Sequence, residues 1–231
     1  MICRSYLFVP GNRPDRFEKA RQSRADAVIL DLEDSVQSTH KDLAREAVAS
    51  WLKPARPAYV RINAEGTPWF ERDLEVVGLP GVLGVVLPKA ERPEQVAKVA
   101  ARLTGEAGVV PLVETALGIW NARALAQAPL VERLAFGAVD FMLDTGISGE
   151  QEDVVHARRL GFRGKLCIHP KQVETINRGF VPTEAELAWA RRVLEAADST
   201  GVGALRLDGE LIDRPVIERA RSILTQGELF A

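Results

Sequence analysis

Residues 81–115, GVLGVVLPKAERPEQVAKVAARLTGEAGVVPLVET, contain the pattern that decides the fold. Apolar runs at both ends flank a middle segment whose apolar residues recur every three to four positions, as on one face of an amphipathic helix. Runs rich in Val and Leu that alternate with such helices are typical of parallel strands covered on both faces. The stretch therefore predicts a strand, a helix and a second, parallel strand.

The same alternation extends along the chain in both directions. The strand candidates are SYLFVP (5–10), DAVILDLED (26–34), AYVRIN (58–63), GVLGVVLPK (81–89), GVVPLVE (108–114), RLAFGAVDF (133–141) and GKLCIHP (164–170). Repeated βα units in a chain of 231 residues favour an α/β fold of the TIM-type (β/α)8 barrel class, although a doubly wound sheet has the same local pattern. We expect the barrel in residues 1–180 and a C-terminal helical extension or lid in residues 181–231.

Composition narrows the class of protein. The chain is 46% hydrophobic and 27% charged with a net charge of -2, which is typical of a globular domain and offers no basic tract for nucleic acid. No run approaches the ~20 apolar residues of a membrane span. Cys3 and Cys167 are isolated in apolar segments, so we expect two buried, reduced thiols and a cytoplasmic protein.

Polar side chains fall at the C-terminal ends of the apolar runs. They are Glu33, Asp34, Arg61, Lys89, Glu114, Asp140 and His169. In a parallel barrel these ends converge on one mouth, where active sites are built. Charged residues at strand ends also cap sheets or pair with one another, and for Lys89 and His169 that structural explanation stays open.

Two of these carboxylates favour a metal site. Glu114 and Asp140 each follow an apolar run, so burial at the mouth requires a partner. Carboxylates on successive strands suit a hard cation such as Mg²⁺, with water and substrate completing the coordination. The histidines lack the paired spacing of a zinc site, and the chain contains no Gly-rich loop for a nucleoside triphosphate or dinucleotide.

A basic cluster lies at the expected start of the first helix. Arg13, Arg16 and Lys19 there are suited to hold phosphate close to the exposed helix amides. A solvated helix face, with local pairing to Asp15 and Glu18, explains the same residues equally well.

Several motifs carry a resemblance to a known family. They are RSYLFVPGNRPDRFEKA (4–20), DAVILDLEDSV (26–36), VRIN (60–63), GTPWFERDL (66–74), LPKAE (87–91), PLVETALGI (111–119), LAFGAVDFMLD (134–144) and GFRGKLCIHPKQV (161–173). In this order they resemble the citrate lyase beta-subunit-like family of the aldolase/citrate lyase superfamily, whose members include malyl-CoA and citramalyl-CoA lyases. The resemblance implies a homotrimeric TIM-type barrel that cleaves a C–C bond in a 3-hydroxyacyl thioester reversibly, with Mg²⁺ or Mn²⁺ as cofactor and a coenzyme A thioester as substrate.

The resemblance also implies roles for particular residues. The expected metal ligands are Glu114 and Asp140. The expected catalytic residues are Arg61, Glu33, Asp34 and Asp213. The expected substrate and coenzyme A contacts are Arg13, Arg16, Lys19, Arg61 and Lys89. Asp213, in the motif ELIDRP, would reach into a neighbouring subunit, and the nearby Asp208 fits that role less well.

Two other functions stay open, and one departure from the family stands out. The same site could add thioester hydrolysis, as in a malate synthase or a malyl-CoA thioesterase, or the chain could be a beta-type subunit that is inactive alone and receives its acyl group from an acyl carrier protein. Family members have a further helix and strand before the segment HARRLGFRGKLCIHP (156–170), whereas SGEQEDV (148–154) here replaces them. The sequence is therefore short by about one βα unit, because of either a true deletion or an intervening segment that it does not include; a true deletion would put the activity in doubt.

Overall fold

The computed structural model describes residues 3–146, 154–200, 205–207 and 210–230. It divides into two compact units, which we call the barrel unit (Met1–Ile176) and the C-terminal unit (Asn177–Ala231). Each has a hydrophobic core of its own, and each is considered by itself.

The described part of the barrel unit contains a sheet of seven parallel strands. They are β1 (Ser5–Pro10), β2 (Ala27–Asp31), β3 (Ala58–Arg61), β4 (Val82–Leu87), β5 (Gly108–Val113), β6 (Ala135–Phe136) and β7 (Lys165–Cys167). Their order in the sheet is β6-β5-β4-β3-β2-β1-β7. Each strand candidate of the sequence supplies one strand, and every residue of β2 and β5 is buried, as expected for strands covered on both faces.

The sheet curls around one interior cluster. The cluster contains Cys3, Tyr6, Ala27, Ile29, Tyr59, Val86, Val110 and Leu112, with Phe8, Ala135 and Leu166 packed against it. These side chains come from all seven strands, including the two edge strands β6 and β7. A sheet can direct side chains from both of its edges into one core only if it is rolled. The predicted TIM-type barrel class is therefore confirmed.

The described ranges contain seven strands of the barrel, one fewer than a (β/α)8 barrel has. Within the described residues β6 and β7 each pair with a single neighbour, so the sheet is open between them. This opening falls where the sequence lacks a βα unit. β6 also ends sooner than predicted, because the chain turns at Gly137 and residues 138–145 form helix α7 instead of continuing the strand.

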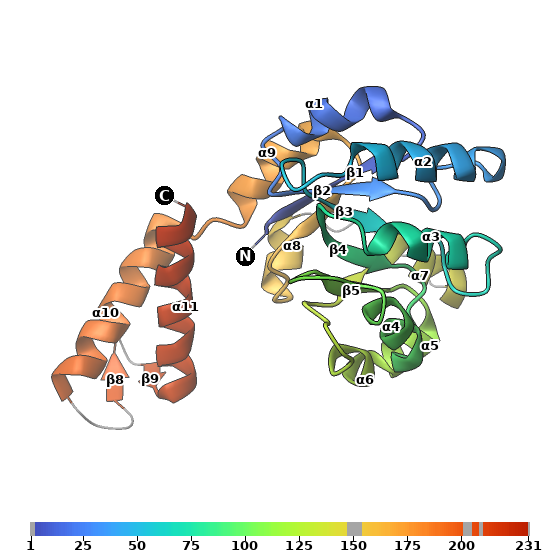
Figure 1. Ribbon diagram of the computed structural model, residues 1–231. Coiled ribbons are helices and arrows are strands. Elements are labelled where there is room, and N and C mark those ends of the chain that lie inside the picture. Colours follow the sequence, from blue (N-terminus) through green and yellow to red (C-terminus); the bar gives the residue numbers. More distant parts are fainter. Residues whose placement is uncertain (1–2, 147–153, 201–204, 208–209, 231) are drawn as a thin grey trace. The chain divides into compact units, whose positions relative to one another are not determined.

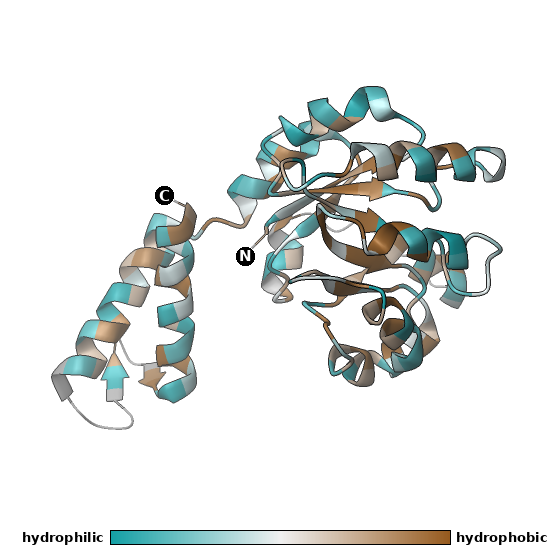
Figure 2. Cartoon of the chain, in the orientation of Figure 1, coloured by the Kyte–Doolittle hydropathy of each residue, from teal (hydrophilic) through white to brown (hydrophobic). Residues whose placement is uncertain are grey.

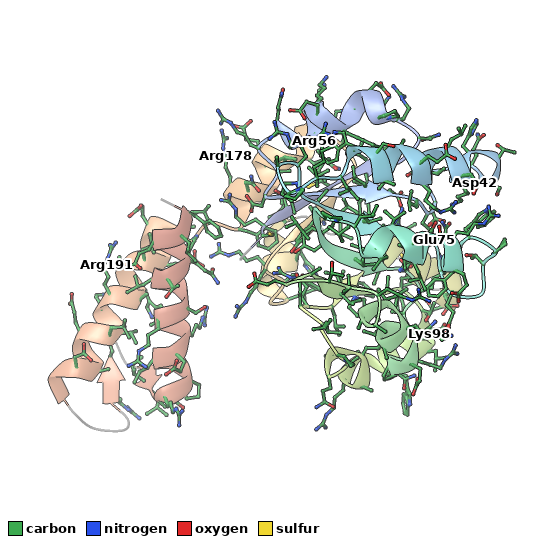
Figure 3. All side chains as sticks on the ribbon, in the orientation of Figure 1. Asp42, Arg56, Glu75, Lys98, Arg178 and Arg191 are labelled. Carbon is green, nitrogen blue, oxygen red and sulfur yellow. The ribbon has the colours of Figure 1, made fainter. Side chains whose placement is uncertain are left out.

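Helices surround the strands of the barrel unit (Figure 1). They are η1 (Pro14–Arg16), α1 (Phe17–Arg21), η2 (Ser38–His40), α2 (Lys41–Trp51), α3 (Phe70–Val77), α4 (Pro93–Ala100), α5 (Ala116–Trp120), α6 (Ala122–Ala126), α7 (Ala138–Thr145), α8 (Val154–Arg159) and α9 (Pro170–Gly179), which extends into the C-terminal unit. Figure 2 shows the hydrophobic residues concentrated on the strands. Charged side chains such as Asp42, Glu75 and Lys98 project outward from α2, α3 and α4 (Figure 3).

The C-terminal unit is a helical pair with a small hairpin. Helices α10 (Glu184–Thr200) and α11 (Arg214–Phe230) pack together, and the antiparallel strands β8 (Leu205–Leu207) and β9 (Glu210–Ile212) connect them. Ala190 and Ala220 are fully buried between the helices, and small side chains there allow close packing.

Two further expectations can be compared with the structure. Cys3 and Cys167 are both buried and unpaired, as predicted. In the described ranges no helix has the combination of length and apolar character that crossing a bilayer requires.

Candidate active site

The C-terminal ends of the barrel strands surround the opening that we call the mouth. An arginine–aspartate pair at the ends of β2 and β3 lies at its inner end. Asp31 ends β2 and is fully buried, and Arg61 ends the neighbouring strand β3. Arg61 donates from Nε and Nη2 to the two carboxylate oxygens of Asp31 at 2.6 and 2.7 Å, and its guanidinium lies 4.6 Å from the centre of the Phe8 ring. Burial alone would raise the pKa of Asp31, but the bonds and charge of Arg61 outweigh burial and hold that pKa below its usual range.

Glu33 lies between two cations. Its Oε1 accepts a hydrogen bond from Lys89 Nζ at 2.8 Å, and its Oε2 lies 3.0 Å from Arg61 Nη1 in an ion pair. Burial still raises the pKa of Glu33 above its usual value, although both cations oppose that shift. Asp34 is exposed, with its carboxylate 4.0 Å from Lys89 Nζ. The β2 exit therefore places one buried and one exposed carboxylate at the mouth.

Lys89 and Glu114 meet through the backbone as well as through charge. Lys89 has a φ of 48°, an uncommon left-handed conformation for a residue with a side chain. In this conformation its N–H donates to Glu114 Oε1 at 2.8 Å, while its Nζ lies 3.9 Å from the same oxygen. Glu114 is 1% exposed, and burial raises its pKa to about 8, assisted by the negative charges of Glu33 and Asp140.

Gly137 and Asp140 complete the mouth from β6 and α7. A Cβ atom added at Gly137 would lie 2.5 Å from Glu114 Oε2, so only glycine leaves room for this carboxylate. Asp140 is in the first turn of α7 and is half-buried. Asp144, one turn later, accepts a hydrogen bond from the Ala116 N–H at 2.8 Å and ties α7 to the start of α5. Glu114 follows β5, and it is surrounded by the start of α5, the turn at Gly137 and the first turns of α7.

The mouth has more negative than positive groups. Its carboxylates are Asp31, Glu33, Asp34, Glu114 and Asp140, and the cations that contact them are Arg61 and Lys89. A divalent cation would offset this surplus. No group of three or more protein ligands suited to a metal occurs in the described ranges. Glu114 and Asp140 fit Mg²⁺ nonetheless, because that ion commonly binds one or two carboxylates and keeps water or substrate in its other positions.

The basic residues predicted to contact coenzyme A follow β1. Arg13 is ion-paired with Asp15 at 2.7 Å, and Arg16 and Lys19 are exposed on η1 and α1. The segment that contains these three residues begins at the C-terminal end of β1, as the segments with the other mouth residues begin at the ends of their strands.

Two predicted residues, Asp213 and His169, have other contacts, and a third lies outside the described residues. Asp213 belongs to the C-terminal unit, where its carboxylate accepts a hydrogen bond from the Val216 N–H at 3.3 Å at the start of α11. Asp208 lies outside the described residues. His169 is exposed, and its Nδ1 accepts a hydrogen bond from the Lys171 N–H at 3.1 Å.

Asp31 and Gly137 were missed by reasoning from the sequence. Asp31 carried a signal, because it is the one charged residue in the run AVILD and an isolated carboxylate in a buried strand needs a partner. Gly137 carried little signal, because its role depends on how close Glu114 comes to it.

Comparison with known proteins assigns the family. Residues 4–160 match the family described as HpcH/HpaI aldolase/citrate lyase. The chain belongs to this family. Residues 125–231 also match a family described as a C–C bond lyase of the TIM-barrel fold. The predictions of a citrate lyase beta-like chain and of a carbon–carbon lyase are confirmed.

Individual relatives cover nearly the whole chain. It is 34% identical to a citrate lyase subunit beta-like protein of Deinococcus radiodurans, over 97% of each chain. It is 29% identical to a (3S)-malyl-CoA thioesterase of Cereibacter sphaeroides strain KD131, over 99% of this chain and 95% of the relative. The crystal structure of the protein CitE of Mycobacterium tuberculosis with magnesium, acetoacetate and coenzyme A has 33% identity and a TM-score of 0.85, over 98% of each chain.

The length of these alignments bears on the open barrel. The alignment with the Deinococcus protein extends over 278 positions, more than the 231 residues of this chain. The relative therefore contains residues that this family member lacks, in agreement with the seven strands found in the described part of the sheet.

Proposed function

We propose that this protein is a Mg²⁺-dependent lyase that reversibly cleaves a 3-hydroxyacyl thioester such as citryl-CoA, citramalyl-CoA or malyl-CoA. The observation that carries the proposal is the buried carboxylate of Glu114, which has a pKa of about 8 and lies beside Asp140 and within reach of Lys89. Such a group is compensated by a bound divalent cation. Support also comes from the related Mycobacterium protein, whose structure holds magnesium, acetoacetate and coenzyme A.

The reaction divides among the residues of the mouth. In the cleavage direction the 3-hydroxyl loses its proton to solvent water, the C2–C3 bond breaks, C3 becomes the carbonyl carbon of an oxo acid, and the electron pair passes to a thioester enolate. A metal ion held by Glu114 and Asp140 would polarise the substrate's hydroxyl and carboxylate oxygens. Arg61, fixed in place by Asp31, stabilises the negative charge that develops on the enolate oxygen.

The remaining roles are assigned to other residues of the chain. Asp213 of a neighbouring chain in a homotrimer returns a proton to the enolate carbon. Glu33 orients Arg61 and Lys89, and Asp34 lines the metal site. Lys89 contacts the substrate, and the phosphates of coenzyme A bind the basic cluster of Arg13, Arg16 and Lys19.

Two other outcomes have specific support. The thioesterase relative favours hydrolysis of the thioester at the same site, as in malyl-CoA thioesterase or malate synthase chemistry. The name of the citrate lyase subunit beta-like relative favours a beta-type subunit. In that alternative the chain is inactive alone and receives its acyl group from an acyl carrier protein. We assign the protein to the cytoplasm because two buried, unpaired thiols suit a reducing compartment.

The proposal is tested with the full chain, Mg²⁺ or Mn²⁺, and a panel of malyl-CoA, citramalyl-CoA and citryl-CoA. Products are followed by mass spectrometry with and without chelator. Chelator-sensitive release of acetyl-CoA and an oxo acid is the expected result. Free coenzyme A together with a hydroxy acid would show hydrolysis instead, and turnover of carrier-bound acyl groups alone would show a subunit. No turnover of any of these thioesters would overturn the proposal.

A further inference from the structure

A buried lysine lies behind the mouth, at the start of α2. Lys41 is 6% exposed. Its ammonium group donates to the carbonyl oxygens of Leu32 and Glu33 at 2.7 and 2.8 Å and to Asn63 Oδ1 at 2.6 Å. All three N–H donors of the ammonium thus have a partner, and two of the partners are backbone atoms of the segment that follows β2.

Asn63 anchors this arrangement to β3 and α3. Its Nδ2 donates to the Leu32 carbonyl at 2.9 Å and to Asp73 Oδ2 at 2.6 Å. Its backbone N–H donates to Asp73 Oδ2 at 2.8 Å, and Asp73 is itself 1% exposed. The Leu32 carbonyl therefore receives hydrogen bonds from two buried side chains. The contacts join α2, the β2 exit and the β3 exit through groups that solvent does not reach.

Fold stability alone gives a poor reason for a lysine here. The three acceptors are uncharged oxygens, and the Trp69 ring, whose centre lies 5.1 Å from Nζ, adds a cation–π attraction. No direct ion pair offsets the loss of hydration of the buried ammonium. An apolar side chain at the same helix position would avoid that cost. The lysine is better explained by the backbone groups that it holds.

The two carbonyl groups that accept hydrogen bonds from Lys41 show which part of the backbone this side chain holds. The Leu32 and Glu33 carbonyls belong to the peptide groups on either side of the Glu33 Cα atom. Fixing both peptide planes sets φ and ψ of Glu33 and hence the direction of its Cα–Cβ bond. β2 ends at Asp31, so regular strand pairing no longer fixes these peptides. The direction matters because Glu33 must meet Lys89 and Arg61 at once.

We infer that Lys41 is a positioning residue of the active site: it holds the peptide groups around Glu33 and so keeps that carboxylate between Arg61 and Lys89. The inference rests on the proposed function for its catalytic consequence. Lys41 acts through Glu33 and Arg61 and does not itself contact the reacting atoms. The metal ligands Glu114 and Asp140 lie on other segments, so we expect the loss of Lys41 to affect metal binding less than turnover.

The test compares Lys41→Met with Arg4→Met. Arg4→Met removes a half-buried cation whose partner is Asp26, at the opposite end of the sheet, and serves as the control for general loss of stability. We expect Lys41→Met to lower kcat on the order of 10²-fold, as misplaced catalytic groups do, with KM and Mn²⁺ affinity changed less than about threefold. Arg4→Met should leave kcat within about threefold of the wild type.

Hydrogen exchange supplies a readout that needs no turnover. In the wild type the amides of Leu32, Glu33 and Val36 are hydrogen-bonded to Arg61 O, Asp31 Oδ1 and Glu33 O. Exchange in residues 32–37 should become faster in Lys41→Met than in Arg4→Met, whereas residues 108–114 should exchange alike in both. If Lys41→Met does not fold, Lys41→Arg keeps the charge, changes the donor geometry and should show smaller shifts of the same kind.

The outcomes separate the two proposals. Unchanged kcat together with unchanged exchange in residues 32–37 would overturn the role of Lys41 and leave the lyase proposal intact. A wild type without turnover on any thioester would overturn the lyase proposal, while the exchange data would still show whether Lys41 holds the segment.

Discussion

The mouth, at the C-terminal ends of the strands, differs from the base, at their N-terminal ends, although both are built from the same strands. On β3, Tyr59 and Arg61 are two positions apart and therefore project to the same face. Tyr59 packs edge-on against Tyr6 at the base, with ring centres 5.6 Å apart, whereas Arg61 lies over Phe8 at the mouth. Both layers place a guanidinium over an aromatic ring, because Arg133 lies 5.6 Å from the centre of the Tyr6 ring at the base, so the layers differ in the partners of their charges.

At the base the carboxylates of Asp26 and Glu132 each have a hydrogen-bond donor from a nearby side chain, whereas at the mouth the carboxylates outnumber the cations. At the base the Asp26 carboxylate accepts hydrogen bonds from Arg4 N, Nε and Nη2 at 2.7 to 2.9 Å, and Tyr59 donates to Glu132 at 2.9 Å. At the mouth burial raises the pKa of Glu114 to about 8 even with Lys89 beside it. The difference is what the proposed metal site requires: charges at the base are paired within the protein, whereas the mouth has a buried carboxylate that a cation would compensate.

The largest expected effect comes from neutralising one carboxylate at each end. Glu114→Gln should lower metal-dependent turnover by at least on the order of 10²-fold, because it removes an anionic oxygen ligand. Asp26→Asn at the base should leave turnover intact and cost about 1–3 kcal/mol of stability. Steady-state rates and denaturant unfolding measure both effects, and near-normal turnover in Glu114→Gln would remove the contrast between the two ends.

A methyl group placed against Glu114 should have the next largest effect. Gly137→Ala brings a Cβ to 2.5 Å from Glu114 Oε2 and should weaken Mn²⁺ binding about 10- to 100-fold. Gly161→Ala is the control, because Gly161 has a φ of +90° and open space around its Cβ position. That variant should lose about 1 kcal/mol of stability and keep its metal affinity. Equal metal affinity in the two variants would show that Glu114 has room to move.

The pH dependence of metal binding sharpens the comparison further. The apparent Mg²⁺ affinity should fall about tenfold for each pH unit below about 8, because Glu114 must release a proton to bind the ion. Between pH 4.5 and about 8 the metal-free folded protein holds this proton and the unfolded chain does not. Glu114 therefore makes stability decrease as pH rises through that window. Calorimetric titration at several pH values measures the first effect, and a flat profile would contradict it.

The smallest expected effect lies at the base. Tyr59→Phe removes one hydrogen bond to Glu132 and should cost about 1 kcal/mol in unfolding experiments. Metal affinity and turnover should not change. A loss of metal affinity in Tyr59→Phe would mean that the two layers of the barrel are coupled.

Local pattern was enough to predict most of the fold. The runs at residues 27–31 and 108–113 became buried strands because Val, Ile and Leu in short runs suit a sheet covered on both faces. The strand expected to reach Phe141 ended at Phe136, because Gly137 turns the chain to pass Glu114 and residues 138–145 are helical. Nothing local to that segment reveals the carboxylate that it must avoid.

The sequence by itself determined the alternation of strands and helices, the family, and the set of charged residues at strand ends, because burial and strand direction follow from short-range patterns. The tertiary structure decided which of those charges meet. Glu33 reaches Lys89 across 56 positions and Arg61 reaches Asp31 across 30, and both contacts depend on strand order and register. Lys41, one of several charged residues in a predicted amphipathic helix, became the buried support of the site because α2 packs its first residue against the exits of β2 and β3.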